Sequence, residues 1–154
     1  MTSRGSRQAR HRILHPTDFS PASRAAFAKA LKLAGERKAE LTLFHVRSLV
    51  APMAGEGYMS ARTYEQLERA AEAEARGRLA RLVGQARRKG VRARGLLAQG
   101  IAHEEIARAA RRDRAEMIVM GTHGRTGLPR FFLGSVAGRV VSVATCPVLT
   151  VRGK

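Results

Sequence analysis

The stretch GTHGRTGLPRFFLGS (residues 121–135) carries four glycines and lies between two apolar segments. Glycine adopts positive φ angles without steric cost and lets a ligand approach the bare backbone. Gly134 and Ser135 stand at the start of a predicted helix, whose first N–H groups attract anions. Glycines that serve turns alone are the alternative interpretation, but four of them ending on a helix N-terminus favour a loop that holds phosphate groups.

The glycine-rich loop follows the fourth of five predicted strands. Short runs of β-forming residues predict strands at 13–15, 41–46, 91–98, 116–121 and 146–151, and helical spacing of apolar residues predicts helices at 21–38, 61–89, 101–113 and 135–144. Ser20 and Pro21 suit the start of the first helix, and Gly90 suits the end of the second. Regular alternation of strands and helices predicts a single α/β domain, with one parallel sheet and helices on both of its faces.

In an open parallel sheet, ligands bind beyond the carboxyl ends of the strands, where the strand order reverses. The segment PTDFSP after the first strand and the glycine-rich loop after the fourth both emerge at this edge. Two other nucleotide motifs are absent. The only Gly-Lys pair is Gly153-Lys154, which excludes a P-loop, and the first strand is not followed by the glycines of a dinucleotide-binding fingerprint.

The histidines and the cysteine do not form a recognisable catalytic pattern. His103 begins HEEIA without the second histidine of a zinc protease, and is expected on a helix surface. His15 and His45 lie in or next to strands, where packing is the better interpretation. His123, between two loop glycines, is expected near a ligand. Cys146 is the only cysteine and is interpreted as a small buried apolar residue.

Gly121-x2-Gly124-x9-Gly134-Ser135, placed between the strand MIVMG and the terminal CPVLTV, resembles the nucleotide motif of the universal stress protein family in its ATP-binding branch. PTDFSPAS, TLFHV and AQGIAHEEIARAA occur in the same order as in that family, so the resemblance spans nearly the whole chain. It implies a flavodoxin-like open sheet of five parallel strands in the order 3-2-1-4-5. It also implies ATP binding, frequent dimerisation and little catalytic activity.

The same resemblance assigns roles to individual residues. Thr17 and Asp18 would face the ribose and adenine, and Val46 would pack on the adenine. The loop residues would line the ribose and phosphate path, and the start of the last helix would receive the phosphates. The implied ATP-binding residues are Pro16, Thr17, Asp18, Val46, Met120, Gly121, His123, Gly124, Arg125, Thr126, Gly134, Ser135 and Val136. Ala137 departs from the pattern, because some ATP-binding members carry a hydroxyl residue there.

The function expected on these grounds is that of an ATP-binding regulatory module of the stress response, with Mg²⁺ or Mn²⁺ accompanying the phosphates. No metal site made by protein residues alone is expected. No general base is evident that would activate water, so ATP hydrolysis is expected to be slow at most. The open alternatives are a slow ATPase and a protein that binds nucleic acid or another polyanion on the same fold.

The charge of the chain is the reason to keep the polyanion alternative. Twenty-nine Lys and Arg stand against twelve Asp and Glu, a formal net charge of +17. Residues 1–12 are interpreted as a flexible basic arm that precedes a single domain at 13–154. The arm from Arg4 to Arg12 and the cluster from Arg87 to Arg94 would support weak, salt-sensitive binding to DNA or RNA. Solvated surface charge without a partner is the competing interpretation.

The remaining expectations concern assembly and location. The last strand would lie at a sheet edge, and Pro147 at its start suits that position because proline cannot donate to a strand ladder. An unpaired apolar edge invites association. The chain is therefore expected to form a homodimer that buries Val148, Leu149 and Val151. Without an apolar run long enough to cross a bilayer, or a signal peptide, a cytoplasmic location is expected.

Overall fold

The computed structural model describes residues 11–48, 60–122 and 133–153. These residues form a five-stranded sheet in the order β3-β2-β1-β4-β5, in which every neighbouring pair of strands is parallel. The elements follow one another along the chain as β1 (Arg12–Pro16), α1 (Pro21–Glu36), β2 (Glu40–Arg47), α2 (Ala61–Arg88), β3 (Ala93–Gln99), α3 (Ala102–Arg112), β4 (Met117–Gly121), α4 (Ser135–Val143) and β5 (Val148–Val151). The predicted flavodoxin-like architecture is confirmed.

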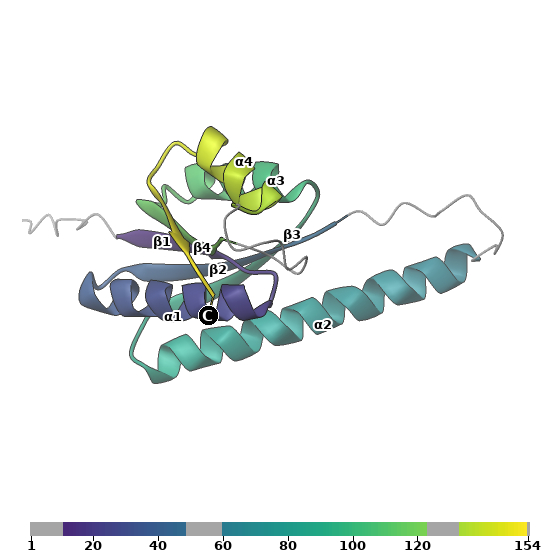
Figure 1. The fold of residues 1–154 in the computed structure, drawn as a ribbon. Helices are drawn as coiled ribbons and strands as arrows, with labels where there is room; N and C mark the ends of the chain where they lie inside the picture. The colour runs from purple at the N-terminus through teal and green to yellow at the C-terminus, as the bar shows by residue number, and fades with distance from the viewer. Residues whose placement is uncertain (1–10, 49–59, 123–132, 154) are drawn as a thin grey trace, which may run out of the picture.

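The helices cover both faces of the sheet. Helices α1 and α2 lie on one face, and α3 and α4 lie on the other (Figure 1). Each face has its own buried core, because successive strand residues point to opposite sides. In β1, Ile13 joins the core under α1 and α2, whereas Leu14 joins the core under α3 and α4. The two cores meet only through the strands, so the sheet is the rigid element on which both faces depend.

Local sequence explains where the first two helices begin and end. The Ser20 hydroxyl accepts a hydrogen bond from the Ser23 N–H at 3.2 Å, and Pro21 occupies the first helical position, which needs no N–H. Gly90 lies in the turn after α2 with φ +76°, a conformation that favours glycine. Val91 is still part of this turn, since its N–H bonds to the Ala86 carbonyl at 3.1 Å. The third strand therefore starts two residues later than the sequence predicts.

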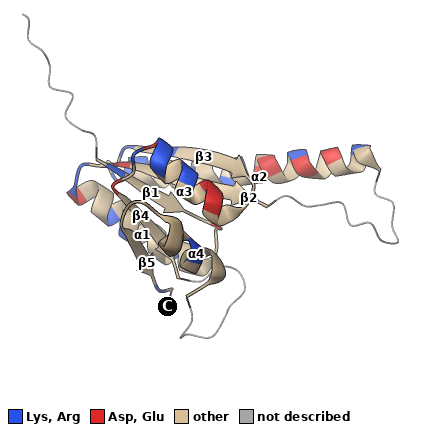
Figure 2. Ribbon diagram, turned by 90° about the horizontal axis from the view of Figure 1, so that it is seen from above, with Lys and Arg blue, Asp and Glu red and all other residues tan. Residues whose placement is uncertain are grey.

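Helix α2 differs along its length. Its second half packs on the sheet through buried residues such as Leu79 and Val83, whereas its first half extends past the sheet (Figure 1). Acidic and basic residues alternate on this first half (Figure 2). Arg47 at the end of β2 holds it by bonding to Glu68 and by pairing with Glu72 at 3.6 Å. A few polar contacts thus take the place of a core in this region.

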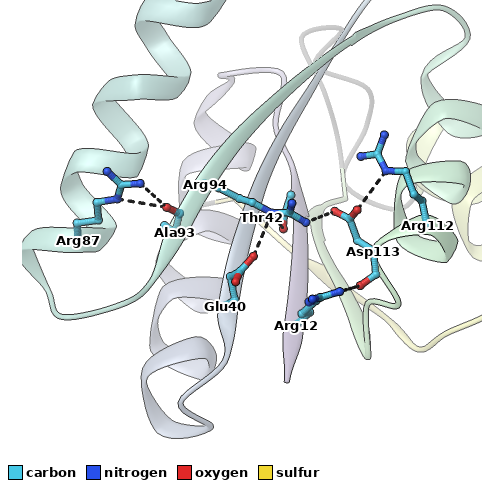
Figure 3. Close-up of polar contacts among 8 residues, drawn as sticks. All are labelled: Arg12, Glu40, Thr42, Arg87, Ala93, Arg94, Arg112 and Asp113. Atoms are coloured by element: carbon cyan, nitrogen blue, oxygen red, sulfur yellow. Dashed lines mark hydrogen bonds and ion pairs between the residues drawn. The ribbon is translucent and has the colours of Figure 1, made fainter. Parts of the chain in front are cut away.

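Charged residues form a network where the strands begin, here named the amino-terminal edge (Figure 3). Arg94 pairs with Glu40 at 3.0 Å and with the buried Asp113 at 2.6 Å, and Arg112 reaches the second Asp113 oxygen at 3.2 Å. Arg12 donates to the Asp113 carbonyl at 2.8 Å. These contacts tie β1, β2, β3 and the end of α3 together.

The cluster from Arg87 to Arg94, considered above as a nucleic-acid contact, is partly used within this edge. Arg87 donates from two guanidinium nitrogens to the Ala93 carbonyl, at 3.0 and 3.2 Å, and Arg94 has the two carboxylate partners just described. Nucleic-acid binding stays a prediction, and these two side chains already have partners inside the fold. Arg12, the last residue of the predicted arm, is the first residue of β1, and residues 1–10 lie outside the described part of the chain.

Candidate nucleotide-binding edge

The strand order reverses between β1 and β4, and the carboxyl ends of these two strands form the candidate site. The chain runs outward from β1 to β2 and β3, then returns to β4 and β5 on the other side. After Pro16, the Thr17 N–H continues the ladder with β2 by donating to the Phe44 carbonyl at 2.8 Å. The end of β1 therefore stays with β2. Such a reversal is where open α/β sheets bind ligands.

The turn after β1 is fixed by its own polar side chains. The Thr17 hydroxyl accepts from the Phe19 N–H at 3.1 Å, and an Asp18 carboxylate oxygen accepts from the Ser20 N–H at 3.0 Å. The Ser23 hydroxyl accepts from the Asp18 N–H at 3.3 Å. Because Thr17 is buried and Asp18 is only half-buried, the turn holds the Asp18 carboxylate at the rim of the edge.

Phe19 and His45 pack together next to this turn. The sequence did not predict a packing role for Phe19. The His45 Nδ1 lies 2.7 Å from the Thr17 carbonyl oxygen, and the rings of His45 and Phe19 have centroids 4.6 Å apart. Packing was the interpretation of His45, and the structure confirms it. The contact partners of His45 depend on the register in which β1 pairs with β2. This register cannot be read from the spacing of residues along the chain.

The end of β4 meets the beginning of α4 through two backbone hydrogen bonds. The Thr122 N–H donates to the Val151 carbonyl at 2.9 Å, and the Gly134 N–H donates to the Thr122 carbonyl at 2.7 Å. The segment between Thr122 and Gly134 therefore leaves and returns at one place, beside the reversal in strand order. The predicted loop residues His123, Gly124, Arg125 and Thr126 belong to this segment and lie outside the described residues.

The first turn of α4 carries no side-chain cap from the described residues. Its N-cap is Gly134, which is buried and has φ −56°, and it is followed by the exposed residues Ser135 and Val136. Free N–H groups at a helix start carry a partial positive charge that suits an anion. Ala137, the position that departs from the family pattern, packs in the core with 3% of its surface exposed.

Gly121 has a packing reason to be glycine that is separate from any ligand. A Cβ atom built on Gly121 would lie 3.1 Å from the Ala22 carbonyl carbon and 3.3 Å from its Cβ. The backbone of α1 thus approaches the end of β4 as closely as a bare backbone allows. A larger side chain on either residue would push α1 away from β4 and open the edge.

The structure places nine of the thirteen predicted residues along this edge. Val46 lies near the end of β2, half-buried against the core under α3 and α4, while Pro16 and Met120 are buried at the ends of β1 and β4. The nine are Pro16, Thr17, Asp18, Val46, Met120, Gly121, Gly134, Ser135 and Val136. Carboxylate and hydroxyl groups and the backbone N–H groups of a helix start are present together with apolar surface, the set of groups that could hold a nucleotide.

His15 lies one residue before Pro16 and is fully buried, as expected for a packed histidine. Its Nδ1 is 2.8 Å from the Val119 carbonyl oxygen, so this nitrogen carries the proton, and Nε2 has no partner among the described residues. Burial lowers the pKa of His15 from 6.5 to about 4, against the opposing effects of the Val119 hydrogen bond and the Asp18 charge. The ring is neutral at pH 7 and serves packing.

No group of three or more His, Cys, Asp and Glu side chains within residues 11–48, 60–122 and 133–153 is arranged to hold a metal ion. No helix in the same ranges is long and apolar enough to cross a bilayer. Cys146 is half-buried, and burial raises the pKa of its thiol, which disfavours the reactive thiolate.

The chain is similar to known proteins over nearly its whole length. Universal stress protein MJ0531 of Methanocaldococcus jannaschii is 36% identical over 92% of this chain and 81% of its own length. The solved structure of protein MJ0577, a universal stress protein of the same organism, superposes with a TM-score of 0.81 at 28% identity, covering 94% of this chain and 96% of that one.

A universal stress protein family protein from Arabidopsis thaliana, solved with AMP bound, has a TM-score of 0.67 at 19% identity, with 94% of this chain and 92% of that one covered. At that identity the likeness concerns the fold alone. The model of the universal stress protein family matches residues 9–152, which include every described element from β1 to β5. By this match and the identity to its relatives, the chain belongs to the universal stress protein family.

Proposed function

We propose that the carboxyl-terminal edge of the sheet binds ATP, and that the chain is a regulatory stress-response module whose nucleotide state alters its interactions. The observation that carries the proposal is the 2.7 Å hydrogen bond from the Gly134 N–H to the Thr122 carbonyl. It sets the uncapped start of α4 beside the reversal in strand order. Phosphates would bind at the N–H groups of Ser135 and Val136, where the helix dipole favours negative charge.

The other end of the nucleotide would lie on the turn after β1. The Asp18 carboxylate can accept hydrogen bonds from ribose hydroxyls, and Val46 offers apolar surface for the adenine. A family member solved with AMP supports an adenine nucleotide as the ligand class. The glycine-rich loop remains a predicted part of the site. A divalent cation would enter with the phosphates, which can coordinate it without an all-protein cage.

Calorimetry with ATP and Mg²⁺ on the wild type and on Gly134→Val tests the proposal. The φ of Gly134 is negative, so valine fits the backbone, but its side chain would occupy space next to the phosphates. We expect binding to be lost in Gly134→Val. Gly77→Val is the matched control, because a Cβ there meets no atom within 4 Å. Equal affinity of the wild type and Gly134→Val would remove the start of α4 from the site.

Asp18→Asn tests the other half of the site without removing the turn. Asparagine keeps the oxygen that accepts from the Ser20 N–H but loses the charge. We expect weaker ATP binding, because a charged acceptor makes the stronger hydrogen bond to a ribose hydroxyl. An unchanged affinity would exclude the carboxylate as a ribose ligand. ATP turnover by the wild type at several per second would contradict a binding module.

We further propose that the chain forms a homodimer through β5. The strand occupies the sheet edge, as predicted, and Val148, Leu149 and Val151 are each only half-buried in the single chain. Light scattering at micromolar concentration should give twice the mass of one chain. Thr150→Lys places a charge in the edge strand, which opposes strand pairing, and should give monomers. A monomeric wild type would contradict this proposal.

A further inference from the structure

A cavity lies between α1 and α2, on the face of the sheet opposite α4. Its volume is about 240 Å³. The floor is apolar and includes Phe19, Phe27 and Leu82, and the rim carries Arg24, Arg78 and Arg81. Thr17, Ser23 and Gln85 complete the lining. The cavity therefore has an apolar interior and a positively charged rim, which is called its mouth below.

Phe19 is held in the cavity wall by a backbone conformation that is rare for its residue type. Its φ is +63°, in the left-handed region that costs a bulky residue free energy. Hydrogen bonds of the turn after β1 enforce this conformation, including the Phe19 N–H to the Thr17 hydroxyl. The Arg78 guanidinium lies over the Phe19 ring, 5.4 Å from its centroid. The aromatic ring is thus fixed beneath a cation.

The cationic charge at the mouth is only partly neutralised. Arg78 pairs with Glu74 at 2.6 Å, but Glu74 is not part of the lining. Within the described part of the chain, Arg24 and Arg81 have no ion-pair partner, and both residues are exposed. A second hollow beside the first is also lined by Arg81, together with Arg88, and by no acidic residue. A binding partner for this mouth would have to be an anion.

We propose that this cavity binds a small organic anion with a flat apolar group, such as an aromatic phosphate or carboxylate. The ring would stack near Phe19 and lie on Phe27 and Leu82, since buried aromatic surface supplies most of the affinity in such sites. The anionic group would face Arg24 and Arg81, which can make charge-assisted hydrogen bonds. The cavity opens on the face of the sheet that carries α1 and α2, whereas α4 covers the other face (Figure 1), and Thr17 belongs both to the cavity lining and to the predicted ATP-binding residues.

The probe for the experiment is 1-naphthyl phosphate, titrated by calorimetry at constant moderate salt. We expect binding to the wild type, and a loss of about tenfold or more in Arg24→Gln and in Arg81→Gln, the size of one charge-assisted hydrogen bond. Arg62→Gln on the exposed start of α2 removes the same charge outside the cavity and should bind as the wild type does. Absence of binding at millimolar probe, or equal losses in all three variants, would overturn the proposal.

Two comparisons separate this site from the ATP site and from simple charge attraction. Gln85→Trp at the exposed rim should block the probe by filling the cavity, with ATP affinity unchanged. 1-Naphthol and inorganic phosphate, which each carry half of the chemistry, should both bind more weakly than 1-naphthyl phosphate. Displacement of the probe by saturating ATP, or loss of its binding in Gly134→Val, would show that the probe uses the nucleotide edge and would contradict a second site.

Discussion

The two edges of the sheet use the same kinds of groups in opposite ways. At the amino-terminal edge, charged side chains from four elements contact one another or a backbone carbonyl, and the buried Asp113 carboxylate accepts from both Arg94 and Arg112 (Figure 3). At the carboxyl-terminal edge, the polar groups include the half-buried Asp18, the hydroxyls of Thr17 and Ser23, and the backbone N–H groups at the start of α4. Ion pairs between side chains dominate the first edge, whereas the second combines a half-buried carboxylate with the start of a helix.

The difference shows that much of the basic charge of this chain lies away from the proposed nucleotide site. Arg94 and Arg87 face partners inside the fold, so their charges stabilise the beginnings of the strands. Anion binding at the other edge would depend on helix geometry and on small residues that let backbones approach. A count of arginines therefore does not locate the site. Variants at each edge should therefore differ in their effects on stability and on ATP binding.

Acid should lower the free energy of unfolding through His15, which lies beside the carboxyl-terminal edge. The folded pKa of about 4 lies below the unfolded value of 6.5, so the unfolded chain binds a proton that the fold rejects. The resulting loss of stability is negligible well above pH 6.5, grows as the pH falls, and reaches about 3 kcal/mol near pH 4. Urea unfolding of the wild type and of His15→Phe across this range measures it. Parallel pH profiles of the two proteins would rule out His15 as the cause.

Removal of the Asp113 carboxylate should destabilise the amino-terminal edge alone. In Asp113→Ala, Arg94 and Arg112 lose a buried acceptor, and we expect the free energy of unfolding to fall by about 2 kcal/mol, less than for a fully buried pair because both arginines reach solvent. Glu65→Ala, which breaks an exposed pair with Arg69, should cost well under about 1 kcal/mol. ATP affinity should be unchanged in Asp113→Ala, and a large loss would show that the two edges are coupled.

Gly121→Ala should disturb the carboxyl-terminal edge by crowding Ala22. The added Cβ would need α1 or β4 to move by a few tenths of an ångström, and we expect a loss of about 1.5 kcal/mol with weaker ATP binding. Gly77→Ala in α2 meets open space and should raise stability by up to about 1 kcal/mol, because alanine favours the helix. Thermal unfolding and calorimetry of both variants give the comparison. A Gly121→Ala protein as stable as the wild type would mean that α1 and β4 can separate enough for the added Cβ without a cost in free energy.

The smallest effect concerns the cap that supports the turn after β1. Ser20→Ala removes the acceptor of the Ser23 N–H, and we expect a loss of about 1 kcal/mol. Ser60→Ala removes an equivalent cap, whose hydroxyl accepts from the Thr63 N–H at 3.1 Å, at the exposed start of α2. Its effect on global unfolding should be smaller, because this end of the helix packs on little else. Equal losses in the two variants would show that the exposed half of α2 contributes to the cooperative core.

Much of the fold could be predicted from the sequence because its signals are local. Ser20, Pro21 and Gly90 mark helix ends through their own backbone chemistry, and the alternation of strands and helices leads to a parallel sheet. The start of β3 was predicted too early because Val91 fits a strand by type but bonds to Ala86 in the preceding turn. The pattern of residue types cannot show which carbonyl group accepts the hydrogen bond of a given backbone N–H.

The candidate site was predictable as a set of segments but not as a set of contacts. The ends of β1 and β4 follow from the strand order, and the family resemblance supplied the residues. Contacts such as Gly121 with Ala22 join positions about a hundred residues apart, and they depend on strand register and helix placement. The contacts of Asp113 with Arg12 and Arg94 likewise join residues that are far apart in the sequence and depend on strand register. Their signal in the sequence is weak, a few charges at the starts of strands that elsewhere are apolar.

The two hydrogen bonds that fix the start of α4 also affect when the site can form during synthesis. Residues 12–113 supply the contacts of Arg94 and Asp113 at the amino-terminal edge, so these contacts can form while the chain is still being made. The Thr122 N–H, by contrast, bonds to the Val151 carbonyl, and Thr122 in turn holds Gly134. The carboxyl-terminal edge must wait until β5 has left the ribosome. A nascent chain would therefore complete the Asp113 contacts first and the start of α4, where the proposed nucleotide site lies, last.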